Sequence, residues 1–360
     1  MASQKLEGYG MRNKGKVGGF MPPATWRKEA ELEKLALEKS KLSYFLDSVL
    51  KGKGKPEKDS PLPFEDAFVA AILPEFKRKF EEHFDYLVES GTLDNTLAIL
   101  YNPDLEPEEI DRHYAALVAI LASPFAMSWA MQHTSEVEEL VTGMYGVATE
   151  MAHETAGLTL PAGFAYNARD LAAIDQFTNT GIIWISEGAH RQVVTSSVHT
   201  LTAYALENNL NRAEFAQLLK NELGYLVPAR ADSYYQNLAS LVMNRTRNTA
   251  RMFDYARLNI QYVVVMTVGD DRVCGRCEIH DGEVYAVEDV VSTMERGLEA
   301  STPEELIDAL PFVNSVTADG FFVLSNGTRV ASSSDADVLA RAGITLPLHP
   351  SCRCFYLIYS

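Results

Sequence analysis

The first 273 residues of this 360-residue chain contain no cysteine, and the whole chain contains only four. A disulfide framework in its N-terminal three quarters is therefore excluded. The N-terminus also lacks the apolar stretch of a signal peptide, so we expect folding in a reducing cytoplasm, where clustered cysteines favour metal over disulfide. No apolar run reads as long enough to span a bilayer, which predicts a protein without a membrane partner.

The sequence also lacks the short signatures of several common enzyme classes. It has no G-x-x-x-x-G-K-[ST] loop, no G-x-G-x-x-G after a predicted strand, and no G-x-S-x-G elbow. His153-Glu154 has no second histidine at the spacing of a zinc protease. These absences favour a protein that is not an enzyme and has no small-molecule substrate.

Positive charge is scarce outside the first 60 residues. The net charge is −17, yet residues 1–60 carry 13 Lys and Arg against 8 Asp and Glu. An acidic body repels nucleic acid at long range, so only the first segment would attract phosphate. Lys51, Lys53 and Lys55 are candidate contacts with DNA or an acidic protein, and a plain flexible linker is an equal alternative.

The rest of the composition, with 47% apolar and 22% charged residues, is typical of a globular chain. Residues 1–60 read as a flexible basic arm and first helix, and residues 61–259 read as a helical body. Residues 260–360 begin with a β-branched run and read as a small module of short strands and helices. The sequence therefore predicts a mainly α fold with a small C-terminal α+β module.

Two patterns in the helical body make specific predictions. Residues 64–90 carry an apolar stripe at helical spacing, which predicts an amphipathic helix. Gly181 is expected to end one helix, and Gly224 with Pro228 is expected to separate two others. Arg245, Arg247 and Arg251 share a face of the last predicted helix. They are candidate contacts with nucleic acid or a partner, although a solvated or salt-bridged face is the plainer interpretation.

The four cysteines stand in two pairs, whose nearest members, Cys277 and Cys352, are 75 residues apart. Cys274 and Cys277 form a C-x-x-C knuckle, and Cys352 and Cys354 follow His349. Thiolates and imidazole are the ligands that hold zinc in tetrahedral sites, and a C-x-x-C turn aims two sulfurs to one side. The spacing therefore predicts a metal site that would close a long loop.

Six residues could fill the four positions around one zinc ion. The favoured set is Cys274, Cys277, His349 and Cys352, with Cys354 or His280 as the alternative ligand. An extended chain would point Cys352 and Cys354 to opposite faces, so binding by both would need a bend. The site is expected to be structural, because no catalytic acid or base stands out beside it. A disulfide and ordinary free thiols are the competing interpretations.

The residues around these cysteines resemble a known family. The C-terminal stretch contains Val273 and the C-x-x-C pair after Asp271, and it ends in His349-Pro350-Ser351-Cys352-Arg353-Cys354, after an Arg-Thr-rich segment at 245–251. This order resembles the phage Mu F-like head-morphogenesis family, the minor head proteins, over roughly residues 185–360. The spacer between the pairs is longer here, and Asn248 stands where the family has an acidic residue.

The resemblance implies a structural virion protein of a tailed phage, made in the host cytoplasm. It implies a location at the portal vertex or inner capsid and a role in head (procapsid) morphogenesis. A contribution to DNA packaging or ejection is a further role that the resemblance allows. Its partners would be the portal protein, the major capsid protein or both, with packaged DNA reached through the arm. Two alternatives remain: a zinc-dependent hydrolase or nuclease, and a free nucleic-acid-binding zinc-ribbon protein.

Overall fold

The computed structural model describes residues 62–100, 106–208, 210–267, 273–350 and 352–359. The expectations for the basic arm, including Lys51, Lys53 and Lys55, lie outside these residues, as does Asp271. Residues 57–360 form one compact unit, so the predicted boundary at residue 259 divides two parts of the same unit. Within that unit the fold is mainly α with a small C-terminal α+β module, as the sequence predicts.

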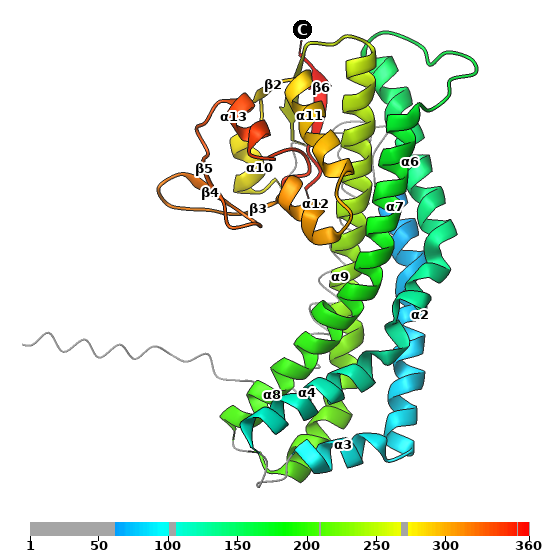
Figure 1. Ribbon diagram of the computed structural model, residues 1–360, viewed down its shortest axis with the longest axis vertical. Coiled ribbons are helices and arrows are strands. Elements are labelled where there is room, and N and C mark those ends of the chain that lie inside the picture. The colour runs from blue at the N-terminus through cyan, green and yellow to red at the C-terminus, as the bar shows by residue number, and fades with distance from the viewer. Residues whose placement is uncertain (1–61, 101–105, 209, 268–272, 351, 360) are drawn as a thin grey trace, which may run out of the picture. The chain divides into compact units, whose positions relative to one another are not determined.

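The helical body consists of long helices joined by short ones. Its helices are α2 (Leu62–Glu89), α3 (Thr92–Leu100), α4 (Pro107–Ala122), η1 (Ser123–Phe125), α5 (Met127–Ala130), η2 (Met131–His133), α6 (Thr134–Thr155), α7 (Ala168–Gly188), the π-helix η3 (Ala189–Thr195), α8 (Ser196–Glu207) and α9 (Arg212–Arg257). Helix α9 packs against α2, α6, α7 and α8 (Figure 1). It is therefore the central helix of the body.

The amphipathic helix predicted for residues 64–90 is confirmed as α2. All six apolar residues of its stripe are buried against the other helices: Phe68, Ile72, Phe76, Phe80, Phe84 and Leu87. The rings of Phe76 and Phe125 stack with their centroids 4.2 Å apart. Burial of these aromatic rings holds α2 against α9, because a buried phenyl ring contributes about 1.5–3 kcal/mol.

The helix breaks predicted at the glycines and the proline are wrong. Helix α7 continues through Gly181, and α9 continues through Gly224 and Pro228 as one helix of 46 residues. A Cβ at Gly181 would lie 3.4 Å from Val137 Cγ1, so this glycine allows α6 to approach closely. Packing on neighbouring helices outweighs the low helix propensity of these residues.

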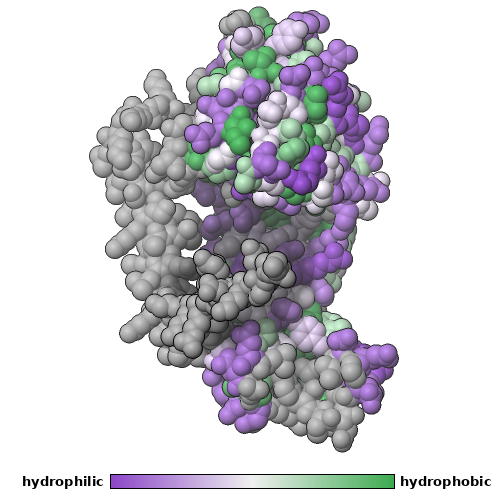
Figure 2. Space-filling view, turned by 90° about the vertical axis from the view of Figure 1, so that its left-hand side faces the viewer, coloured by the Kyte–Doolittle hydropathy of each residue, from purple (hydrophilic) through white to green (hydrophobic). Residues whose placement is uncertain are grey.

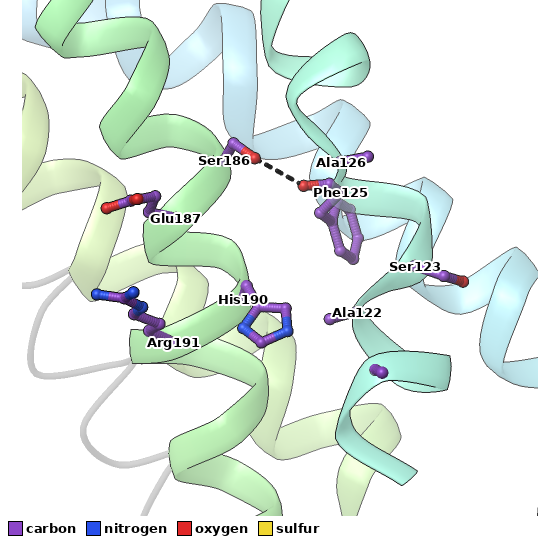
Figure 3. Close-up of a pocket in the computed structure, with 9 residues that line it drawn as sticks. Ala122, Ser123, Phe125, Ala126, Ser186, Glu187, His190 and Arg191 are labelled. Atoms are coloured by element: carbon purple, nitrogen blue, oxygen red, sulfur yellow. Dashed lines mark hydrogen bonds between the residues drawn. The ribbon is translucent and has the colours of Figure 1, made fainter. Parts of the chain in front are cut away.

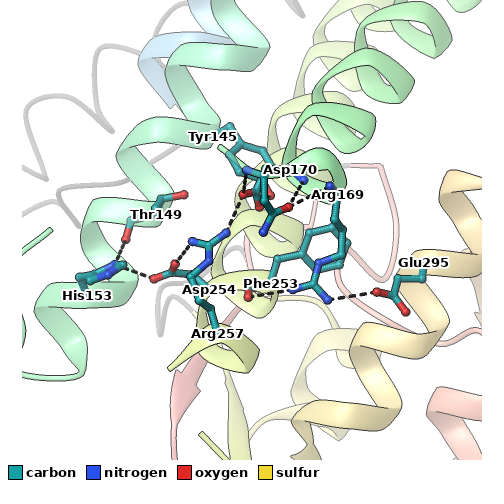
Figure 4. A network of polar contacts seen from close by, with 10 residues as sticks. Tyr145, Thr149, His153, Arg169, Asp170, Phe253, Asp254, Arg257 and Glu295 are labelled. Atoms are coloured by element: carbon teal, nitrogen blue, oxygen red, sulfur yellow. Dashed lines mark hydrogen bonds and ion pairs between the residues drawn. The ribbon is translucent and has the colours of Figure 1, made fainter. Parts of the chain in front are cut away.

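A buried polar network joins α6, α7 and α9 (Figure 4). Asp170 accepts a hydrogen bond of 2.7 Å from the Tyr145 hydroxyl and pairs with Arg257 at 2.6 Å. Arg257 also pairs with Asp254, whose carboxylate lies 2.6 Å from His153 Nδ1. Burial raises the pKa of Asp254, which the charges of His153 and Arg257 partly offset. The network fixes the relative positions of three helices.

A second buried carboxyl group makes stability depend on pH. Glu65 accepts a hydrogen bond of 2.9 Å from Asn244, and burial raises its pKa from the ordinary 4.5 to about 7, despite the charge of Arg247. A folded-state pKa above the unfolded one means that the folded protein holds the proton more tightly. Stability contributed by this proton is therefore present below pH 4.5 and is lost as the pH rises towards 7.

We expect Glu65→Gln to lose less stability than the wild type as the pH rises from 4.5 towards 7. For one titrating group the loss of unfolding free energy approaches about 1.4 kcal/mol per pH unit. Urea unfolding of both proteins at pH 5, 6, 7 and 8 would measure it as the change in their stability difference. Glu81→Gln, at an exposed position of the same helix, is the control. Parallel stability curves for the wild type and Glu65→Gln would contradict the prediction.

The C-terminal module contains two small antiparallel sheets. Its elements are β1 (Tyr262–Met266), α10 (Gly275–His280), β2 (Val284–Ala286), α11 (Val287–Leu298), α12 (Pro303–Ala309), β3 (Val313–Val316), β4 (Phe321–Leu324), β5 (Arg329–Ala331), α13 (Ala336–Arg341) and β6 (Phe355–Ile358). The strand orders are β2-β1-β6 and β3-β4-β5. Asn326-Gly327, a dipeptide typical of hairpin turns, lies between β4 and β5, and Gly327 takes a φ of 82° there.

The chain's end returns to the start of the module. Strand β6 pairs antiparallel with β1, in a register that sets Val265 opposite Tyr356. Helix α9 packs against β6 and α11 (Figure 1). Strand β6 therefore contacts both β1 and the central helix of the body.

One helical stretch among the described residues, Asp111–Thr155, is long and apolar enough to cross a membrane by length and composition. This corrects the expectation that no apolar run reaches that length. The stretch is interrupted by η1 and η2, and its Leu117, Leu121, Val137 and Val141 are buried in the body. A core stretch passes the same test, so the stretch is weak support for a membrane span.

Exposed apolar side chains are spread over the molecule. On the coloured part of the face in Figure 2, green residues lie scattered among purple ones. Large exposed side chains include Tyr86 on α2, Met131 on η2 and Tyr262 on β1, which belong to distant elements. Scattered apolar residues of this kind are normal for a folded surface and indicate no particular partner.

Candidate metal centre

The first cysteine pair lies at the start of α10. Cys274 is the residue before the helix, and Cys277 lies in its first turn, where the Glu278 amide bonds the Cys274 carbonyl at 3.0 Å. This turn places both sulfurs on one side, with Cys274 Sγ 3.8 Å from Cys277 Sγ. The C-x-x-C knuckle predicted from the spacing is therefore present.

The tail brings a histidine to this knuckle. His349 Nε2 lies 3.2 Å from the sulfurs of both Cys274 and Cys277. The Cys352 amide bonds the His349 carbonyl at 2.9 Å, so the chain turns between these two residues. As a result, Cys352 Sγ reaches 3.7 Å from Cys277 Sγ.

The tail cysteines lie on the same side of the chain. Cys277, Cys352 and Cys354 form one group of possible metal ligands, and Cys274, Cys277 and His349 form another. Both groups contain Cys277. The expectation that Cys352 and Cys354 point to opposite faces is wrong, because residues 352–354 are irregular and β6 begins only at Phe355.

The spacing of the sulfurs suits a tetrahedral metal. Zinc–sulfur bonds of about 2.3 Å place two ligand sulfurs about 3.8 Å apart across a tetrahedron. The observed 3.8 Å and 3.7 Å agree with this edge. All four cysteines are free, and their separations are far beyond the about 2.05 Å of a disulfide bond. The cluster can therefore hold a metal ion, which this geometry alone does not identify.

The ionisation of the cluster differs between its donors. Hydrogen bonding to Cys352 raises the pKa of the Cys277 thiol, whereas Cys352 and His349 are shifted towards the forms that bind metals. Burial by itself would raise the pKa of the Cys352 thiol, but hydrogen bonds from Cys277 and Cys354 and the nearby His349 outweigh it, and the pKa lies well below 9.0. Burial lowers the pKa of His349, so its imidazole is neutral at pH 7. Thiolate and neutral imidazole are the forms that bind metals.

The structure places the six candidate ligands unequally. It brings together Cys274, Cys277, His349, Cys352 and Cys354, which form the Cys/His cluster. His280 lies outside both groups: its Nδ1 bonds the Tyr285 hydroxyl at 3.0 Å, and its ring stacks on Phe322. Burial lowers the pKa of His280 to about 4. Five donors therefore compete for the four positions of a tetrahedral ion.

One residue beside the cluster escaped the sequence reasoning. Arg276 lies between the two cysteines of the knuckle and donates to the carbonyls of Val313 and Asn314 at 2.8 and 2.9 Å. Its side chain also bonds the Cys274 sulfur and, against the effect of burial, helps to lower the pKa of that thiol. Its position inside C-x-x-C was the available signal, but its strand β3 partner could not be foreseen.

The three arginines proposed as contacts with nucleic acid or a partner are buried. Arg245, Arg247 and Arg251 are 3%, 1% and 0% exposed. Their guanidinium groups donate to backbone carbonyls of the C-terminal module. Because an enclosed side chain cannot reach an external ligand, this burial contradicts the contact prediction. It also contradicts a solvated face, which was one half of the plainer interpretation.

The acidic residues near the knuckle lie outside the cluster. Glu278, Asp281 and Glu283 are exposed, and neither group of possible ligands contains a carboxylate. Asp281 instead accepts a hydrogen bond of 2.7 Å from the Thr267 amide. Its carboxylate therefore bonds the backbone directly after β1.

A cavity of about 330 Å³ lies in the helical body, remote in the chain from the cluster. It opens between the η1 region and the junction of α7 with η3, and His190, Arg191 and Glu187 line it together with alanines (Figure 3). Ser186 closes one side by donating to the Phe125 carbonyl at 2.9 Å. None of the cluster residues lines this cavity.

The Cys/His cluster is thus the part of the described structure in which soft metal donors gather. The chain matches no protein-family model, no curated protein and no solved structure.

Proposed function

We propose that the Cys/His cluster binds one structural zinc ion through Cys274, Cys277, His349 and Cys352, with Cys354 as the competing ligand. Support comes from the donor chemistry, which is that of structural zinc sites, and from the tetrahedral spacing of the sulfurs. The ion would join the knuckle of α10 to the tail before β6. A metal clip on so long a loop removes much of the entropy of the unfolded chain.

We propose further that the protein is a structural minor head protein of a tailed phage. It acts in head morphogenesis at the portal or inner capsid, with the portal or major capsid protein as its partner. The observation that carries this proposal is the gathering of the C-x-x-C pair and the His-Pro-x-Cys-Arg-Cys tail, which bear the resemblance, in one cluster whose Cys277, Cys352 and Cys354 are buried. In this role the protein resides in the virion, after assembly in the host cytoplasm.

The competing functions find less support in the described residues. A zinc hydrolase needs an open coordination position beside an acid or base. The nearby Glu278, Asp281 and Glu283 stand outside the cluster, and Cys277, Cys352 and Cys354 are buried. A free zinc-ribbon protein that binds nucleic acid would present basic side chains, whereas Arg247 and Arg251 are enclosed.

The metal proposal predicts about one zinc ion per chain, since one tetrahedral ion uses four donors. The chain would be purified under reducing conditions, and zinc would be measured by atomic absorption beside titration of accessible thiols. We expect the chain to carry bound zinc and to show few accessible thiols. A zinc content near zero with all four thiols titratable would contradict the metal site.

The assembly proposal predicts that the tagged full chain enters phage heads in few copies per particle. Heads would be purified by sedimentation after co-expression with the portal and capsid proteins of the same phage, and the tag would be quantified. A variant with serine at all four cysteines is the control for the metal cluster. A wild-type chain that remains unassociated throughout head assembly would contradict the role.

A further inference from the structure

Buried donors on α9 hold the backbone of the tail that carries the last two cysteines. Arg247 Nη2 donates to the carbonyls of Arg353 and Cys354 at 2.9 and 3.1 Å. Asn248 Nδ2 donates to the same Cys354 carbonyl at 3.2 Å. The two peptide units that flank Cys354 are therefore fixed from the helical body, two residues after Cys352.

The same helix continues to hold the chain after the cysteines. One turn beyond Arg247, Arg251 Nη1 donates to the Tyr356 carbonyl at 2.9 Å. The Phe355 ring lies near both guanidinium groups, at 5.3 Å from Arg247 and 5.1 Å from Arg251. Helix α9 thus follows the tail from the irregular segment into β6.

These contacts have a physical reason. Residues 352–354 belong to no strand, so their buried carbonyls find no partner in a sheet. A guanidinium group offers five N–H donors in one plane, which suits two adjacent carbonyls. Burial of Arg247 costs free energy, and bonds to tail carbonyls offset part of that cost only when the tail is in place.

We propose that Arg247 and Asn248 are positioning residues of the metal centre, which hold the tail so that the Cys352 and Cys354 sulfurs meet Cys277. This inference rests on the proposed metal site and assigns a role to α9 in it. Seating of the tail on α9 and metal binding then strengthen each other by the same factor, because coupling between two equilibria is reciprocal.

The test compares zinc affinities of full-length variants by competition with a coloured zinc chelator. Arg247→Met is expected to weaken zinc binding by about 10- to 100-fold, the usual loss when a residue behind the ligands is removed. Arg245→Met is the matched control, since Arg245 is equally buried on α9 but donates to the Leu310 carbonyl. Equal zinc affinities of the two variants would overturn the proposal.

A second measurement keeps the test decisive if Arg247→Met folds poorly. Arg247→Lys keeps the charge with a single donor group, and Asn248→Ala removes one bond to Cys354 while leaving Arg247 in place. Both are expected to speed amide hydrogen exchange in residues 353–358 of chelator-treated protein, relative to Arg245→Met. Unchanged exchange there would overturn the positioning role.

The two proposals fail in different ways. If the wild type and all variants bind no zinc, the metal site is wrong. Exchange in the metal-free protein then still reports whether Arg247 and Asn248 hold the tail. If the wild type binds zinc and Arg247→Met binds it equally well, the metal site stands and the positioning role is wrong.

Discussion

Replacing Cys277 with serine is expected to abolish stoichiometric zinc binding and to loosen the end of the chain. Cys277 is the shared member of both groups of possible ligands, and its sulfur lies 3.2 to 3.8 Å from His349, Cys274 and Cys352. No other single substitution removes a donor from both groups. Removing a residue that only supports a ligand typically weakens metal affinity about 10- to 100-fold. The loss for Cys277→Ser should be larger, because this substitution removes a ligand itself.

The measurement is zinc per chain by atomic absorption, with the chelator-competition affinity and guanidinium unfolding beside it. Cys354→Ser is the matched control: it removes an equally buried sulfur but leaves the group of Cys274, Cys277 and His349 intact. We expect this control to keep its zinc. If Cys277→Ser kept a full zinc complement while Cys354→Ser lost it, the proposed ligand set would be wrong.

Replacing Asp170 with alanine is expected to cost about 3–5 kcal/mol of stability, the usual loss when one partner of a buried ion pair is removed. Asp170 is 1% exposed and accepts bonds from Tyr145, from Arg257 and from the Asn167 amide. The substitution leaves the Tyr145 hydroxyl buried without this acceptor and weakens the hold between α6, α7 and α9.

Guanidinium unfolding followed by circular dichroism would measure this loss. Glu295→Ala provides the control, since Glu295 pairs with Arg169 at 3.0 Å at the edge of the network, where its side chain is 48% exposed. An exposed pair contributes about 0–1 kcal/mol. Asp170→Asn should fall between the two, because it keeps the shape and loses the charge. Similar losses for Asp170→Ala and Glu295→Ala would contradict the prediction.

The sequence predicted correctly those helices, strands and turns that have a strong local sequence pattern. The apolar stripe of α2, the β-branched run of β1, and Asn326-Gly327 between β4 and β5 all lie where the sequence places them. Each depends on neighbouring residues only, through the helical period, β propensity or the need for a positive φ. The breaks expected at Gly181 and Pro228 failed because helices from elsewhere in the chain pack there.

The Cys/His cluster also has features that the sequence predicted and features that depend on distant parts of the chain. The types and spacing of its cysteines were enough to predict that Cys274, Cys277, His349 and Cys352 would gather. The position of Cys354 was not predictable, because it depends on an irregular segment whose carbonyls are held from α9. Arg247 looked like a surface residue for the same reason: its partners lie more than 100 residues away.

By itself, the sequence determined that this is a mainly helical chain. Its only thiols stand near the C-terminus in two pairs with the spacing of metal ligands. Donor chemistry and short-range periodicity are properties of residue types and their spacing, and both can be read along the chain. Only the tertiary structure decided that Cys277 is the shared donor and that buried arginines serve the tail. Those outcomes depend on which distant carbonyls and sulfurs meet in the core, where burial makes every unpaired group costly.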